Sequence, residues 1–251
     1  MSVSLAREGA VRIITIHRPA ARNAIDPETA EALRAAFEAG EVDESTHVTV
    51  LTGAGDHFCA GADLKAVSRH WHPQPGADHG PLGPTRMRLT KPLIAAVEGY
   101  AVAGGLELAC LADMRVASES AVFGVFCRRF GVPLIDGGTV RLPRLIGESR
   151  AMDMILTGRP VTAQEAHGMG LANRLVPRGR ALETALDLAQ QIAAFPQTCL
   201  RGDRQSVHQQ WALPEAEALK NESRIGDESL KAGAAEGAAR FTEGEGRHGQ
   251  F

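Results

Sequence analysis

The chain has 251 residues, 44% of them hydrophobic, which is enough for one large domain with a sizeable core or one domain with a small helical addition. Its formal net charge of −3 at pH 7, without a long charge run, argues against a nucleic-acid surface, and four cysteines without CxxC spacing argue against a zinc site or a disulfide framework. The first residues lack the apolar core of a signal peptide and no apolar run is long enough to span a bilayer, so we expect a cytoplasmic protein that binds neither membrane nor nucleic acid.

The first half of the chain alternates strand and helix signals. The β-branched run 11–16 predicts a strand. Asp26-Pro27-Glu28 then supplies an N-cap, a proline in the first helical turn and an acidic residue beside it, so a helix is expected over 27–39. Further strands are expected at 48–52, 93–97, 114–117 and 121–123.

Beyond about residue 147 the pattern becomes helical. Helices are expected over 149–156, 162–169 and 180–194, and Thr162 with Glu165 has the form of a capping box. From residue 198 onward the chain is rich in Ala, Glu and Gly and poor in strand formers. Strands that alternate with helices and then give way to helices alone predict an α/β core over 1–195 and a C-terminal helical region over 196–251.

Two segments could direct backbone N–H groups at one ligand. Gly104 and Gly105 precede an apolar helical run, where free N–H groups and the helix dipole favour negative charge, and Glu107 lies in the first turn, where it could move a proton. Upstream, residues 57–65 lead from a strand into a small-residue turn at Ala62. If the N–H groups of Ala62 and Gly104 converge, they form an oxyanion hole.

Five stretches in matching order resemble the crotonase (enoyl-CoA hydratase/isomerase) superfamily. The similarity runs from about residue 11 to residue 176 and is carried by 17–24, 59–65, 91–113, 136–147 and 156–173. The resemblance implies an α/β fold, with a crotonase-like ββα spiral core and a helical C-terminal region, that assembles as a homotrimer or a dimer of trimers.

The same resemblance implies an acyl-CoA thioester as the substrate. Its carbonyl oxygen would be held by the N–H groups of Ala62 and Gly104, where they stabilise an enolate-like state. No metal and no cofactor are implied, because CoA is part of the substrate. Contacts with CoA are implied for Ala21, Arg22 and Ala24 near the adenine, for Ala60, and for Lys65 near the phosphates.

One position departs from the family pattern. Hydratases of the family typically hold the attacking water between two glutamates twenty residues apart, and the position twenty residues after Glu107 is Cys127. A thiol, with an ordinary pKa of about 8.5, is a poor replacement for a carboxylate that orients water. Asp136 is a possible substitute, because in dienoyl-CoA isomerase-like branches an aspartate near this place handles a proton. We therefore predict Glu107 as the principal acid/base and Asp136 as the second proton-handling group.

The sequence favours a 2-enoyl-CoA hydratase-type lyase and leaves two alternatives open. One is an enoyl- or dienoyl-CoA isomerase that uses Glu107 and Asp136. The other is a CoA-thioester binder with weak or no catalysis, since one carboxylate of the pair is missing. Plainer interpretations also exist: Glu107 could complement a helix N-terminus, Asp136 could be a turn residue, and Cys127 is expected to be an inert core residue.

The histidines between residues 70 and 79 invite a metal interpretation. They have no neighbouring acid or thiol except Asp78, which does not make a tetrahedral ligand set. This stretch is instead predicted to be a loop over the acyl pocket.

Overall fold

The computed structural model describes residues 1–66 and 77–246, which form two compact units, Met1–Ala193 and Ala194–Phe251. Most of the histidine-rich stretch predicted as a loop over the acyl pocket falls in 67–76 and lies outside the described residues. Within the described ranges, every helix is too short or too polar to cross a membrane.

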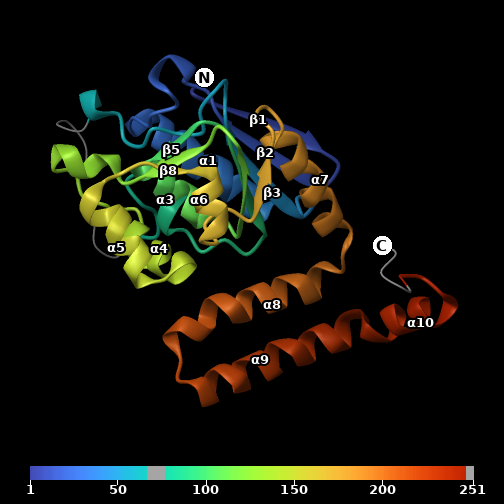
Figure 1. Ribbon diagram of the computed structural model, residues 1–251. Coiled ribbons are helices and arrows are strands. Elements are labelled where there is room, and N and C mark those ends of the chain that lie inside the picture. Colours follow the sequence, from blue (N-terminus) through green and yellow to red (C-terminus); the bar gives the residue numbers. More distant parts are fainter. Residues whose placement is uncertain (67–76, 247–251) are drawn as a thin grey trace. The chain divides into compact units, whose positions relative to one another are not determined.

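A six-stranded sheet organises the first unit (Figure 1). The strands lie in the order β1 (Val3–Glu8), β2 (Val11–Ile16), β3 (Val48–Gly53), β4 (Leu93–Val97), β6 (Met114–Ser118) and β9 (Arg174–Val176). Only the β1–β2 pair is antiparallel, and the other pairs are parallel. Parallel neighbours need crossover connections, and α1 (Pro27–Val42) supplies the one between β2 and β3.

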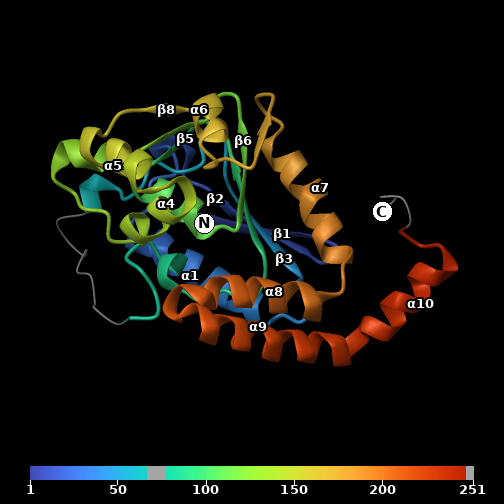
Figure 2. The ribbon, with the colours of Figure 1, turned by 60° about the horizontal axis from the view of Figure 1, so that its bottom comes forward.

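The central strands β3, β4 and β6 are buried on both faces of the sheet. In β4, Leu93, Ala95 and Val97 join the cluster that includes residues of α1 and of α3 (Gly104–Leu111). Ile94 and Ala96 point the other way, into a second cluster with the alanines of α7 (Ala181–Ala194). Figure 2 shows α7 on one side of the strands and α4 (Gly138–Ile146) on the other.

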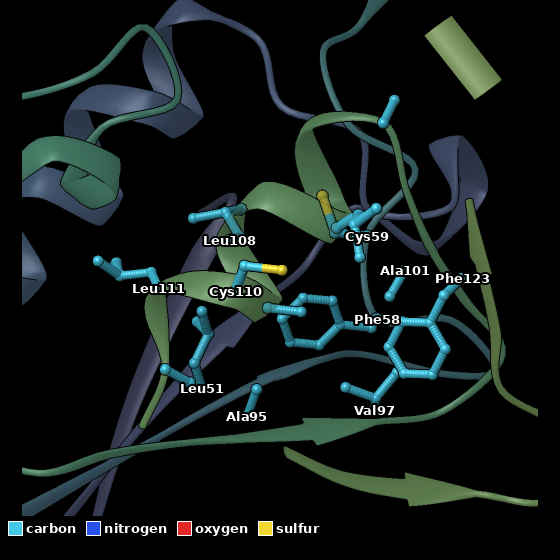
Figure 3. Close-up of a cluster of buried hydrophobic side chains, with 14 of the residues drawn as sticks. Leu51, Phe58, Cys59, Ala95, Val97, Ala101, Leu108, Cys110, Leu111 and Phe123 are labelled. Carbon is cyan, nitrogen blue, oxygen red and sulfur yellow. The ribbon is translucent and has the colours of Figure 1, made fainter. Parts of the chain in front are cut away.

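A second sheet of three short strands leads into the helix that carries Glu107. It contains β5 (Tyr100–Val102), β7 (Val122–Gly124) and β8 (Val161–Thr162), with β5 parallel to β7 and β8 antiparallel to it. Cys59 pairs with Ala101 in a parallel bridge beside β5. The close-up in Figure 3 shows Phe58 and Cys59 packed among side chains of α3, including Leu108 and Cys110.

Short helices complete the first unit. They are η1 (Pro19–Ala21), η2 (Pro84–Arg86), η3 (Phe126–Phe130), α5 (Glu148–Thr157) and α6 (Ala163–Gly168). The second unit contains α8 (Gln197–Gln209), η4 (Gln210–Ala212), α9 (Glu215–Ser229), a π-helical turn at Leu230–Ala234 and α10 (Ala235–Glu243). Within it, α8 packs on α9 where Gly202 meets Ile225.

The α/β prediction is confirmed, and most predicted elements agree with the structure. β2 and β4 have the predicted bounds, α1 continues three residues beyond its predicted end, and the Thr162 hydroxyl caps α6 by accepting the Glu165 N–H at 3.2 Å. The sequence analysis missed β1, β5, β8, β9 and α4. In α4, the starting glycines and the internal Pro143 suggest a turn rather than a helix.

Gly105 marks the closest approach of α3 to the Cys59 segment. A Cβ at this position would collide with the Cys59 carbonyl, so Gly105→Ala should lower the free energy of unfolding by about 3 kcal/mol or more. Gly168→Ala is the matched control, because a Cβ there meets no atom within 4 Å in the helical α6. Denaturant unfolding of both variants tests this, and equal stability of the two would contradict it.

Candidate functional site

The two segments predicted to supply backbone donors lie against each other. Gly61 has φ +92°, and a Cβ there would lie 2.8 Å from the Gly104 nitrogen. A Cβ on Gly104 would in turn lie 3.5 Å from the Gly61 Cα. The backbones of 61–62 and 103–104 are therefore in contact, and only glycine permits so close an approach.

Hydrogen bonding fixes the direction of the Ala62 N–H. Ala62 forms a parallel bridge with Ile25, in which the Ile25 N–H donates to Gly61 and the Asp63 N–H donates to Ile25, both at 2.8 Å. In a parallel bridge of this kind, Gly61 and Asp63 on either side of Ala62 make the hydrogen bonds to Ile25. The N–H of Ala62 itself therefore points away from Ile25. Gly104 begins α3, so its N–H has no acceptor within the helix. Neither N–H donates a hydrogen bond to the described part of the chain.

Ala103 holds a strained backbone conformation immediately before Gly104. Its φ of 54° and ψ of −125° are unusual for a residue with a side chain and cost about 1–3 kcal/mol. Its N–H donates to the Gly124 carbonyl at 2.8 Å, which anchors the turn from β5 into α3. The sequence analysis did not identify this residue, because alanine gives no sign of a left-handed conformation.

Glu107 is buried with one oxygen held by backbone. Oε1 accepts the N–H of Asp136 at 2.9 Å and that of Gly138 at 2.8 Å. Burial, and to a smaller extent the negative charge of Asp136, raise the pKa of Glu107 to about 8 against the opposing effect of the two N–H donors. Oε2 has no hydrogen bond to the described chain, so it is the oxygen that can exchange a proton with a ligand.

Asp136 is equally buried and is brought directly beside Glu107. Its Oδ1 accepts the Leu82 N–H at 2.9 Å and the hydroxyl of Thr85. Burial raises the pKa of Asp136, while these two donors lower it. Leu82 also connects this group to the backbone donors, because a Cβ on Gly104 would collide with the Leu82 side chain.

Cys127 lies in η3, close enough to Glu107 for the charge of the carboxylate to act on it. Burial raises the pKa of the Cys127 thiol, and the charge of Glu107 raises it further. A thiol in such a place stays neutral and behaves as a small apolar group.

Among the described residues there is no group of three His, Cys, Asp or Glu side chains that could hold a metal ion.

The residues predicted to contact CoA lie on adjoining loops. Arg22 has φ 51° and places its guanidinium 5.6 Å from the centre of the Tyr100 ring. Its carbonyl accepts the Ala60 N–H at 3.0 Å, and the Ala24 N–H donates to the Ala21 carbonyl at 3.0 Å. The structure thus brings Ala21, Arg22, Ala24 and Ala60 together.

Lys65 is exposed, at the beginning of the helical residues 64–66 that follow this group. Its N–H donates to Asp63 at 3.1 Å. Asp63 is in turn held by Arg18, which also bonds Asp26 at the start of α1. Lys65 therefore extends from a braced turn next to the other predicted CoA residues.

Sequence reasoning missed the residues that hold Asp136. Thr85 and Leu82 lie more than fifty positions upstream, in a stretch with no helical or strand periodicity. Arg141 follows Asp136 on α4, and donates to the carbonyls of Asp136 at 3.1 Å and Thr85 at 2.7 Å. The one available signal was the Asp136-Gly137-Gly138 sequence, which reads equally well as an ordinary turn.

A family model described as enoyl-CoA hydratase/isomerase matches residues 6–248. The chain belongs to this family. It is 42% identical to the enoyl-CoA hydratase EchA19 of Mycobacterium tuberculosis, over 94% of this chain and 92% of that protein. It is 41% identical to a carnitinyl-CoA dehydratase of Salmonella typhi, over 76% of this chain and 74% of that protein.

Solved structures agree with the family assignment. The crystal structure of the enoyl-CoA hydratase EchA1 from Mycobacterium marinum superposes with a TM-score of 0.91 at 36% identity, and covers 96% of both chains. The resemblance to the crotonase superfamily inferred from the motifs, and the crotonase-like α/β fold that it implied, are confirmed.

The raised pKa of Glu107 makes the stability of this family member depend on pH. Folded Glu107 keeps a proton up to about pH 8, whereas the unfolded residue loses it near the ordinary value of 4.5, so its contribution to stability declines as pH rises between these values. The decline is at most about 1.4 kcal/mol per pH unit. Glu107→Gln keeps an acceptor oxygen for both N–H groups but has no proton to lose. The melting temperature of this variant minus that of wild type should therefore increase as the pH rises from 5 to 9. A melting-temperature difference that stays constant over this pH range would contradict a Glu107 side chain that is buried and protonated.

Proposed function

We propose that this protein catalyses the addition of water to the double bond of a 2-enoyl-CoA thioester. The observation that carries the proposal is the pair of buried carboxyl groups, Glu107 and Asp136, linked by the Asp136 N–H, with Glu107 on the helix that begins at Gly104. Family membership and the enoyl-CoA hydratase names of its relatives support the same reaction.

The backbone donors act on the thioester oxygen. When water attacks the β-carbon, negative charge moves through the conjugated system onto this oxygen and gives an enolate-like state. The N–H groups of Ala62 and Gly104 bind that state more strongly than the neutral substrate, and one such donor typically contributes ~2.7–4 kcal/mol of transition-state stabilisation.

The two carboxyl groups divide the proton transfers between them. Asp136 is assigned as the ionised partner, because two donors at Oδ1 and the positive charges of Arg86 and Arg141 favour its charged form. At neutral pH, Oδ2 of ionised Asp136 takes a proton from water as the hydroxide adds to the β-carbon. Glu107 then gives the proton on Oε2 to the α-carbon, and the proton held by Asp136 passes back to Glu107 before the next turnover. One water molecule is consumed and the enzyme is regenerated.

The CoA portion of the substrate is proposed to lie along the adjoining loops. The backbone of Ala21, Arg22 and Ala24, with Ala60, would meet the adenine end, and Lys65 would lie near the phosphates. We also propose that the protein works in the cytoplasm as a homo-oligomer, either a trimer or a dimer of trimers, as members of the superfamily usually do.

The isomerase alternative rests on Cys127, which stands where two-glutamate hydratases carry their second acid. Moving a double bond needs a group that removes a proton from one carbon and a group that returns it to another, and Glu107 and Asp136 could supply both. Crotonyl-CoA and a 3-enoyl-CoA distinguish the reactions. Fast isomerisation without hydration would replace the hydratase proposal by the isomerase.

Substitution of either carboxyl group should abolish most of the activity. Glu107→Gln and Asp136→Asn should each lower kcat for hydration of crotonyl-CoA by about 10²–10⁴-fold, because each removes one general acid/base group and keeps the acceptor oxygens. Cys127→Ala is the control and should keep kcat within about threefold of wild type. Full hydratase activity in Glu107→Gln would reject the assignment.

The pH profile of the reaction should follow the protonation of Glu107. Because Glu107 must carry a proton to supply the α-carbon, kcat/KM should fall above about pH 8, where the free enzyme loses it. Steady-state hydration of crotonyl-CoA between pH 5 and pH 10 measures this. A rate that stays level to pH 10 would show that another group supplies the proton.

A further inference from the structure

The segment before β4 that contacts Asp136 is a braced turn. The N–H groups of Gly80 and Gly83 donate to each other's carbonyls at 2.9 Å, which closes residues 80–83 into a tight loop. Gly83 has φ +89°, and a Cβ there would collide with the carbonyl of Ala30 in α1. The segment is therefore held against α1 at a fixed distance, with Thr85 directly after it in η2.

Thr85 is fully buried, and its hydroxyl donates to Oδ1 of Asp136. The space around this contact is filled, because a Cβ at Gly80 would collide with the hydroxyl and lie 2.6 Å from Oδ1. The hydroxyl thus has neither room for another partner nor access to water. Its position is determined by the aspartate.

Arg141 links the backbones of Asp136 and Thr85. Its Nη1 donates to the carbonyl of Asp136 and its Nη2 to the carbonyl of Thr85. A single rigid guanidinium therefore spans the backbones of both residues. Arg86 adds a third link by donating to the Ile135 carbonyl at 2.9 Å.

Two donors at Oδ1 decide which oxygen of Asp136 can carry a proton. An N–H from Leu82 and a hydroxyl from Thr85 both need lone pairs at Oδ1, so this oxygen stays an acceptor. Any proton that Asp136 takes up must then reside on Oδ2. Without the hydroxyl, Oδ1 would have one free lone pair and the two oxygens would compete.

We propose that Thr85 is a positioning residue for the reaction: its hydroxyl holds Asp136 so that Oδ2 alone exchanges the proton. This role rests on the proposed function, in which Asp136 takes a proton from water. Thr85 touches neither the substrate nor water in that scheme and acts only through the aspartate.

Loss of the hydroxyl changes hydrogen bonding but not net charge. The other titratable and charged groups that act on Asp136, or on which it acts, remain in place in such a variant: Glu107 from α3, Arg86 from η2, Arg141 from α4 and the buried thiol of Cys59. Because the hydroxyl stabilises the ionised form, its removal raises the pKa of Asp136. The acid side of the kcat profile should move to higher pH.

The test compares Thr85→Val with Thr85→Ser in the full chain. Thr85→Val keeps the shape of the side chain and loses the hydroxyl donor. For crotonyl-CoA hydration at pH 7, kcat should fall about 10–100-fold while KM stays within about threefold of wild type. The acid limb, which is the low-pH side of the kcat profile, should shift to higher pH. Thr85→Ser restores the donor and should recover kcat to within about threefold, with the limb at its wild-type position. A purely structural role would leave the limb unmoved in both variants.

Three further outcomes are informative. If folded Thr85→Val has the kcat of wild type and an unshifted acid limb, while Asp136→Asn is inactive, the positioning role is overturned and the proposed function remains intact. Full activity in Asp136→Asn would instead overturn the use of Asp136 itself, and with it this role. If Thr85→Val does not fold, Thr85→Cys replaces it, because a thiol is a weaker donor and should give an intermediate shift, and an unshifted limb would reject the proposal.

Discussion

The hydrogen bonds from the N–H groups of Asp136 and Gly138 to Oε1 of Glu107 connect the two halves of the site. They join the first turn of α3 to the beginning of α4, so that two carboxyl groups from separate segments are buried beside each other. The same contact buries Glu107, and this burial is the largest cause of its raised pKa. Both the placement of the two carboxyl groups and the roles proposed for them therefore depend on this backbone contact.

Cys127 takes a different meaning once this contact is known. Cys127 stands where the family resemblance implies the second glutamate of a typical hydratase, and the buried Asp136 lies beside Glu107 from another segment. The buried Cys127 thiol stays neutral and adds no charge next to Glu107. The relatives of this chain include a protein named as an enoyl-CoA hydratase and one named as a carnitinyl-CoA dehydratase, and hydration and dehydration are opposite directions of one type of reaction.

How well the sequence predicts a feature depends on how far apart along the chain the interacting residues lie. β2, β4 and the start of α1 were predictable because β-branched runs and the Asp26-Pro27 cap act within a few residues. The close approach of the Gly61 and Gly104 backbones is in keeping with the glycine placement and the family resemblance. Thr85 and Leu82 were not predictable, because only the folded chain brings a loop without periodicity to Asp136. Ala103 was missed since its strain is imposed by the turn and not encoded in its side chain.

The contact between Leu82 and Gly104 also has an evolutionary consequence. A methyl group added at 104 collides with one branch of the leucine, while its next contacts are at 3.4 Å and 3.5 Å, near ordinary van der Waals separation. The two positions are therefore coupled: an alanine at 104 requires the Leu82 side chain to move or to be shortened. Which residues position 104 accepts during evolution thus depends on the residue at 82.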